Sequence, residues 1–442
     1  MDGVSLACIA LLFILLAILS AHRSQSWLAP APVWNLCWAA LFAMTAALGY
    51  GFYFPTTPVA ALVLLAATYN VPAFVLNSAV TPRGTPEQDE RSRRYAPPAW
   101  LLLVTAAIGF LGLVKLGQDL GTSLFSLRSL DQLFSLGQQN AVTIFRGEAS
   151  FSFVVNITFA VLQLGGALAG VRIALRPTSR TVWATLPIFL IAFLWSSVTT
   201  QRSYLLVPVV WFAAGYIAAE VWKGKRSLPS RAIVSAAAGG AVMLLLIVFL
   251  RAVRTGGTSA ELSEQAFAPT RLWLAGYVPT FSAWYEQSES TGLSFGLFNG
   301  VVALVQPLLG GRSVDDSGDG NFYYIGEGLT SNAGTIMMRI VGTGGLAWGA
   351  LTVLTLGLIA QVVYRRAARG SATAAALYVG VIAFTLWSTN AWFLGYGGRV
   401  LALAGLLAMA WLAGSALRRE RNKLGASTPV PPVAHRSPAA LL

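Results

Sequence analysis

The chain has 442 residues, of which 56% are hydrophobic and only 11% are charged, and its mean hydropathy is +0.65. A soluble domain of this length needs more polar surface, so composition excludes that class and predicts an integral membrane protein with many spans. The formal net charge is +13. We assign most of this charge to cytoplasmic loops beside lipid head groups, and we expect no nucleic-acid partner.

Eleven apolar runs with few charged residues approach the roughly 20 residues that a helix needs to cross the hydrocarbon core. Abundant Ala and Leu favour helices over barrel strands, so we expect an all-α polytopic transmembrane fold. The expected spans are Val4–Ala21, Val33–Phe54, Pro58–Val80, Ala99–Leu116, Phe151–Leu175, Val182–Thr199, Tyr204–Trp222, Ala232–Leu250, Ile336–Tyr364, Ala372–Trp392 and Val400–Leu417. The first lacks a basic start and an Ala-x-Ala cleavage site, so we expect it to be retained as a helix.

Basic residues are concentrated in alternate loops, and short basic loops remain in the cytoplasm. These loops lie near residues 83–94, 176–180, 223–231 and 365–369, and in the tail after residue 417. With eleven spans, the N-terminus is therefore expected outside and the C-terminus in the cytoplasm. Residues 118–150, 200–203, 251–335 and 393–399 then face the extracytoplasmic side.

This pattern predicts a single transmembrane domain over residues 1–417, with one large extracytoplasmic loop at residues 251–335. Residues 418–442 are basic and Pro-rich, and we expect a disordered cytoplasmic tail. Within the loop, Leu293–Leu309 is apolar but is interrupted by two glycines and a proline. We expect a re-entrant or interfacial helix there; a true span remains the alternative if Trp273–Trp284 also crosses.

Histidine and cysteine offer little for chemistry in the large loop. Cys8 and Cys37 lie in expected spans, and His22 and His435 lie in a cytoplasmic loop and in the tail. We therefore expect neither a disulfide framework, nor a metal site, nor a cofactor.

Arginines are the candidate binding groups on the extracytoplasmic side: Arg202, Arg251, Arg254, Arg271, Arg339 and Arg399. A guanidinium at the membrane surface, on the side where positive charge is disfavoured, costs on the order of a kcal/mol or more. Arginine binds phosphate oxygens with two donors at once, so a group of arginines there suits a lipid-linked pyrophosphate. The simpler interpretation is that each arginine extends to phospholipid head groups.

The large loop also contains carboxylates and aromatic side chains. Glu289, Asp319 and Glu327 are candidate catalytic bases, and the default interpretation is that they belong to a solvated loop. Asp315-x3-Asp319-Gly320 resembles only part of a calcium loop, so no metal is expected. Trp273, Tyr277, Phe281 and Trp284 recur at helical spacing. We expect them on one face of a helix lying in the membrane interface, or stacked against sugar rings.

Four short motifs together resemble the oligosaccharide repeat unit polymerases, the Wzy-type O-antigen polymerases. They are Thr199-Thr-Gln-Arg202-Ser-Tyr204, Glu289-Ser-Thr-Gly292-Leu-Ser-Phe295, Thr330-Ser-Asn332-Ala-Gly-Thr335 and Val341-Gly-Thr-Gly-Gly-Leu-Ala-Trp-Gly349. The resemblance covers roughly Phe151 to Arg369. Some members of the family have Arg-rich repeated loop motifs that this chain does not show.

The resemblance implies a metal-independent membrane glycosyltransferase of a bacterial inner membrane. Such an enzyme transfers a growing glycan from a polyprenyl-pyrophosphate carrier onto the next lipid-linked repeat unit, with a flippase and a chain-length regulator as partners. It implies that Arg202 holds the leaving pyrophosphate, with loop arginines such as Arg254 and Arg271 assisting. Asn332, Trp273, Tyr277 and Trp284 are then candidate substrate contacts.

Other functions remain open on the sequence. An O-antigen ligase uses a histidine in its large external loop, and this loop has none. The other large class of lipid-phosphosugar glycosyltransferases is expected to have acidic residues in the first external loop, and Pro55–Thr57 has none. A flippase or transporter is expected to show repeats and charged residues within its spans. A membrane scaffold also remains.

Overall fold

The computed structural model describes residues 1–76, 93, 95–121, 129–145, 151–254, 270–287, 301–302, 322–326, 328–390, 393 and 396–427. The helices are α1 Gly3–Ser24, α2 Pro30–Leu48, α3 Thr56–Thr68, α4 Val71–Val75, α6 Ala99–Asp119, α7 Leu130–Phe145, α8 Phe153–Leu175, α9 Ser179–Thr199, α10 Ser203–Trp222, α11 Ser230–Arg254, α13 Tyr277–Gln287, α15 Ile336–Ala368, α16 Ala372–Trp387 and α17 Gly397–Ser427. Strands β1 Tyr323–Gly326 and β2 Leu329–Ser331 form an antiparallel hairpin.

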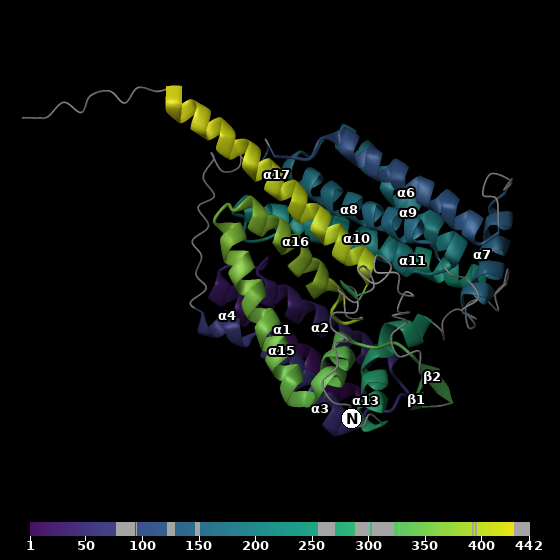
Figure 1. Cartoon of the computed structure of the whole chain (residues 1–442). Coiled ribbons are helices and arrows are strands. Elements are labelled where there is room, and N and C mark those ends of the chain that lie inside the picture. Colours follow the sequence, from purple (N-terminus) through teal and green to yellow (C-terminus); the bar gives the residue numbers. More distant parts are fainter. Residues whose placement is uncertain are drawn as a thin grey trace, which may run out of the picture.

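The helices confirm a polytopic, mostly α-helical membrane protein. Within the described residues, nine helices are long and apolar enough to cross a membrane, with α3 and α4 taken together as Thr56–Val75. Two more apolar helices, α16 and the first part of α17, are shorter. Each of the eleven expected spans therefore contains a helix. In Figure 1 these helices form one bundle, with α13 and the hairpin beside the N-terminus.

Several expected spans have different boundaries from those that hydropathy predicts. The run Val33–Phe54 does not continue as one helix, because α2 ends at Leu48 and Gly51 adopts a positive φ of 75°. Residues 49–55 instead form a connection to α3. The run Pro58–Val80 is interrupted at Asn70, between α3 and α4. Hydropathy measures apolar content and does not detect a local change of backbone direction.

Asn70 is one of a buried polar pair inside the bundle. Its amide donates to Asn35 Oδ1 at 2.9 Å, and the Asn35 amide donates to Asn70 Oδ1 at 2.7 Å. Both side chains are buried. An amide within an apolar bundle needs a partner for each polar atom, so this reciprocal pair links α2 to the start of α4.

Helix α15 contains a kink in the Gly-rich motif of residues 341–349. Gly345 has φ 81° and ψ −176°, a conformation that is open almost only to glycine. An unbroken helix of 33 residues would be about 50 Å long, far more than the hydrocarbon core of about 30 Å. The kink leaves residues 346–368 as the length that suits a span, and turns residues 336–343 into a separate segment.

Helices α8 and α10 approach each other so closely that their backbones touch. A Cβ on Gly170 of α8 would lie 2.0 Å from the carbonyl oxygen of Phe212, and one on Gly215 of α10 would lie 2.2 Å from that of Ala167. Small residues allow this contact in membranes, where helices associate mainly through close packing. The α8–α10 pair therefore fixes the position at which α10 begins.

The connections between helices form two groups, one at each end of the bundle. At one end, Tyr53 N donates to Ile325 O at 2.8 Å and Ile336 N donates to Ser388 O at 3.3 Å. At the other end, Trp27 N donates to Arg226 O at 2.8 Å and Lys223 Nζ donates to Ala174 O at 2.9 Å. We call the first the long-loop end and the second the basic end. This grouping agrees with the alternation of basic loops along the sequence.

Candidate functional site

Arg202 lies at the long-loop end, in the short turn between α9 and α10. It occupies the N-cap position of α10, and its carbonyl accepts from Leu205 N and Leu206 N. Thr200 has a positive φ of 54°, which closes the turn. Ser196 Oγ donates to Gln201 O at 3.0 Å and secures the turn from α9. The backbone of Arg202 is thus held on both sides.

Helix α7 adds a third support and lies where only a loop was expected, within residues 118–150. The Asn140 amide of α7 donates to Val198 O at 3.0 Å. A Cβ on Gly137 would lie 2.3 Å from Ser197 O, so α7 runs directly against the last turn of α9. The loop that the sequence predicted therefore contains a helix that positions the Arg202 turn.

The Arg202 guanidinium lies over the ring of Trp273, with 4.6 Å from Cζ to the ring centroid. Trp273 belongs to the helical residues 270–275 that precede α13, far from Arg202 in the chain. Both side chains are half-buried. A cation over an indole face is attracted by about 0.5–2 kcal/mol, depending on how far water is excluded. The structure therefore brings together two of the residues that the sequence singled out.

Tyr277 is the third member of this group. Burial raises the pKa of Tyr277 to about 12, while the charge of Arg202 and a hydrogen bond with the Trp273 side chain both act to lower it. The hydroxyl therefore remains protonated at physiological pH. Tyr277 can hold a ligand oxygen by hydrogen bonding but cannot act there as a base.

Gly276 separates Trp273 from Tyr277 and allows the close fit of this segment. A Cβ at that position would lie 3.2 Å from Ser331 Oγ of β2 and 2.2 Å from Leu272 O. The helix is interrupted at Gly276, so Trp273 lies before the interruption whereas Tyr277 and Trp284 lie on α13. Tyr277, Phe281 and Trp284 are buried within the protein. Helical spacing identifies a shared face but not what covers it.

Arg271 lies two residues before Trp273, so its side chain leaves the helical turn in a different direction. Its Nε donates to Leu48 O at 2.7 Å, in the last turn of α2. Its guanidinium lies 3.5 Å from the ring centroid of Tyr50 and 4.6 Å from that of Phe52. The residue is 7% exposed, and Nη2 has no hydrogen-bond partner among the described residues. Arg271 thus caps α2 and retains one donor group.

Arg399 is enclosed by aromatic rings near the start of α17. Its Cζ lies 4.1 Å from the ring centroid of Tyr396, 4.8 Å from that of Trp387 and 5.0 Å from that of Phe393. Nη1 donates to Phe393 O at 3.3 Å. The residue is 5% exposed, and no carboxylate in the described part of the chain forms an ion pair with it. The ring faces and the carbonyl compensate for this buried charge.

The remaining described candidates lie around the first segment of α15. Trp284 packs against α15 at Gly342, where a Cβ would lie 3.4 Å from Trp284 Cζ2. Arg339 is half-buried on α15, and Asn332 is exposed directly after β2. Trp284 therefore packs against the first segment of α15, whereas Asn332 is accessible from the long-loop end.

Several candidates lie beyond what the structure describes. Glu289, Asp319 and Glu327 are outside the described residues, as is Leu293–Leu309 apart from residues 301–302. Arg251 and Arg254 end α11, and their side chains are not described. Among the residues searched, no group of three His, Cys, Asp or Glu side chains could hold a metal ion.

Sequence reasoning missed Tyr50 and Phe52, the rings that hold Arg271. It placed them inside the expected span Val33–Phe54. The Gly49-Tyr-Gly51 spacing, which is typical of a helix end, is the signal that predicts a connection there. Gly326 of the hairpin packs onto this connection, since a Cβ on it would lie 2.5 Å from Gly51 O.

Comparison of the chain with protein-family models, with curated proteins and with solved structures gave no match. The fold and the site by themselves define a polytopic α-helical membrane protein, with an arginine–aromatic group at one end of its bundle.

Proposed function

We propose that the protein is an oligosaccharide repeat unit polymerase. It transfers a growing glycan from a polyprenyl-pyrophosphate carrier onto the next lipid-linked repeat unit at the extracytoplasmic membrane face. The observation that supports this most strongly is the contact between Arg202 and Trp273 at 4.6 Å. It joins a cation suited to phosphate with an aromatic residue of the large loop that holds it in place, from two segments within the resembling region.

In this reaction the acceptor hydroxyl oxygen of the incoming unit attacks the anomeric carbon of the growing chain. A new glycosidic C–O bond forms while the C–O bond to the pyrophosphate breaks, and the carrier pyrophosphate leaves with the electron pair. The proton of the acceptor hydroxyl passes to a base, for which Glu289, Asp319 and Glu327 are the candidates. Atoms and charge balance without a metal, a cofactor or a nucleotide sugar.

Within this proposal, Arg202 stabilises the charge that develops on the leaving pyrophosphate. Electrostatic stabilisation of a leaving group is usually the largest single contribution that such a site makes. Trp273 keeps the guanidinium in place, and the protonated Tyr277 hydroxyl is a second donor beside it. Arg251, Arg254 and Arg339 are auxiliary candidates, whereas Arg271 and Arg399 are held by aromatic rings and a carbonyl. A flippase and a chain-length regulator are the proposed partners.

Deletion of the gene in the native host tests this function directly. We expect single repeat units to accumulate on the lipid carrier while long chains disappear, as measured by gel electrophoresis and mass spectrometry of lipid-linked and surface glycans. Intact polymer that remains on its carrier would instead identify a ligase. Unchanged glycans in a host without a second copy would reject both enzymes and leave a transporter or scaffold.

The proposed orientation is tested by cysteine labelling at the two ends of the bundle. We expect the Asn332→Cys thiol, in a Cys8- and Cys37-free background, to react with a membrane-impermeant maleimide in intact cells. Ser227→Cys is the matched control, because Ser227 is also exposed but lies at the basic end. Its thiol should react only after the membrane is opened. The reverse pattern would place the long-loop end in the cytoplasm and contradict the proposal.

A further inference from the structure

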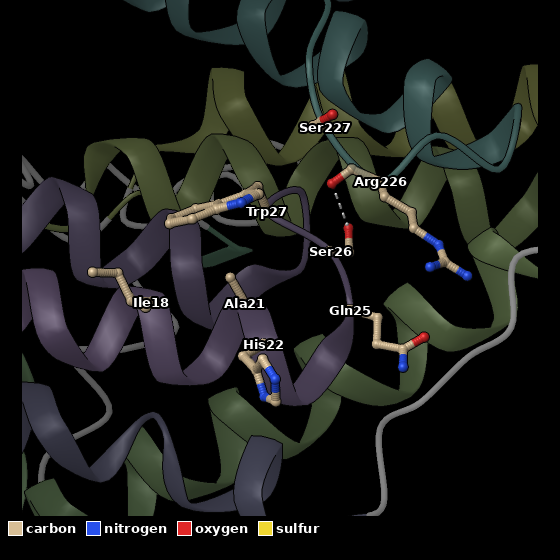
Figure 2. A pocket seen from close by; sticks show the side chains of 8 residues that line it. All are labelled: Ile18, Ala21, His22, Gln25, Ser26, Trp27, Arg226 and Ser227. Atoms are coloured by element: carbon tan, nitrogen blue, oxygen red, sulfur yellow. Dashed lines mark hydrogen bonds between the residues drawn. The ribbon is translucent and has the colours of Figure 1, made fainter.

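A pocket opens at the basic end of the bundle, on the opposite side of the membrane domain from Arg202. It lies between the α1–α2 connection and the α10–α11 connection, and its volume is about 340 Å³. Figure 2 shows the side chains that line it. Neither the resemblance nor the proposed reaction uses this pocket.

The walls of the pocket are fixed by hydrogen bonds to one carbonyl. Arg226 O accepts from Trp27 N at 2.8 Å and from Ser26 Oγ at 3.2 Å, and the second bond is drawn in Figure 2. Gln25 adopts a left-handed conformation with φ 51°, which ends α1 and turns the chain toward this contact. The backbone is thus held while the Arg226 and Gln25 side chains extend into the open space.

The pocket is positively charged. Arg226 is exposed, and its guanidinium makes neither an ion pair nor a hydrogen bond within the described residues. Glu220, in the last turn of α10, is already bound to Lys223 at 2.6 Å. The carbonyls at the end of α1 disfavour an anion, but the charge of Arg23 in that same turn opposes them. The net electrostatic preference is for an anion.

The lining changes from apolar to polar along α1. Ile18, His22 and Gln25 follow at spacings of four and three residues, so they share one face over about 10 Å of helix. Ile18 is 47% exposed, and Trp27, at the rim, is 45% exposed. A soluble anion gains nothing from the apolar part. A lipid fits both the polar and the apolar part of the lining, with its phosphate near Arg226 and its glycerol and chains near Ile18 and Trp27.

We propose that this pocket binds a phospholipid with a net negative head group. The phosphate lies against the Arg226 guanidinium and the Gln25 amide, and the first carbons of the chains contact Ile18 and Trp27. Basic pockets between transmembrane helices at an interface recognise such head groups. The bound lipid joins the α1–α2 connection to the α10–α11 connection. This inference is independent of the proposed function.

The test uses the full-length protein in lipid nanodiscs that contain equal amounts of phosphatidylglycerol and phosphatidylethanolamine. Native mass spectrometry measures which lipids remain bound after release from the disc. We expect the wild type to retain phosphatidylglycerol preferentially, and Arg226→Gln to lower its affinity for that lipid about fivefold, as expected for loss of one cation near a membrane surface. Lys225→Gln removes the same charge from the neighbouring exposed residue, which does not line the pocket, and should retain wild-type binding.

Three outcomes would overturn the proposal. Equal retention of the two lipids by the wild type would show that no anionic site exists. Equal losses in Arg226→Gln and Lys225→Gln would reduce the effect to general surface charge. Displacement of bound phosphatidylglycerol by 10 mM inorganic phosphate would identify a site for soluble anions instead of a lipid. Should Arg226→Gln fail to yield monodisperse protein, Arg226→Met removes the same charge from the same pocket, with the same loss expected.

Discussion

Arg202→Ala is expected to abolish polymer formation, with a fall in rate of at least about 100-fold. Loss of one donor that stabilises a developing anion typically costs a factor of 10² to 10³. The loss is expected to be large here because Arg202 is held over Trp273 by a fixed turn. The measurement is the size distribution of lipid-linked glycan in a deletion strain that expresses the variant.

Arg180→Ala is the matched control, because Arg180 is an exposed arginine at the start of α9 and belongs to the basic end. It should restore wild-type polymer. The amount of each variant in the membrane and its unfolding temperature separate a catalytic loss from a folding loss. Long-chain polymer at wild-type levels in Arg202→Ala would remove Arg202 from the proposed mechanism.

Arg202→Lys distinguishes charge from geometry. Lysine keeps the positive charge but cannot donate two parallel hydrogen bonds to phosphate oxygens, and it stacks less well over an indole ring. We therefore expect Arg202→Lys to recover only a small part of the activity. Full recovery would show that charge alone matters at this position.

Gly170→Ala adds one methyl group at the contact between α8 and α10, and we expect it to destabilise the bundle strongly. The added Cβ would lie 2.0 Å from Phe212 O, and backbone atoms cannot move aside as the end of a flexible side chain can. Helices α8 and α10 would have to separate along their contact. We expect a loss of about 3 kcal/mol, the upper part of the usual range for overpacking, in the free energy of unfolding.

Gly239→Ala provides the same change in an open environment. Gly239 lies in α11, and a Cβ there would meet nothing within 4 Å. Alanine should leave stability unchanged or raise it by up to about 1 kcal/mol, because glycine is the poorer helix former. Unfolding in detergent measures both variants. Similar free energies of unfolding for Gly170→Ala and Gly239→Ala would mean that α8 and α10 do not pack as closely as described.

The candidate site was predictable in its membership but not in its arrangement. Arg202 and Trp273 were selected from the sequence for separate reasons, one as a cation at the surface and the other as an aromatic residue in the large loop. Their contact depends on how α10 packs against α8, and on where the segment that precedes α13 packs beside the Arg202 turn. Neither condition is visible as a pattern in hydropathy or spacing.

Arg271 and Arg399 illustrate the opposite case. Both were expected to be surface arginines that reach phosphate, and both are buried against aromatic rings and a backbone carbonyl. Their positive charge shows that each arginine needs compensating contacts. The rings and carbonyls that provide these contacts belong to connections whose boundaries hydropathy misplaced. Hydropathy assigns residues 49–54 to a span, which gives no reason to expect Tyr50 and Phe52 beside an arginine.

The sequence by itself determined the class of this protein and the alternation of its loops. Crossing a bilayer requires a minimum length of apolar residues, and basic loops are retained on one side. Both properties therefore depend only on the composition of short stretches of the chain. The tertiary structure decided which arginine meets which ring, where α15 bends at Gly345, and which polar side chains face a pocket. These features depend on contacts between distant segments, and such contacts are determined by the packing of whole helices.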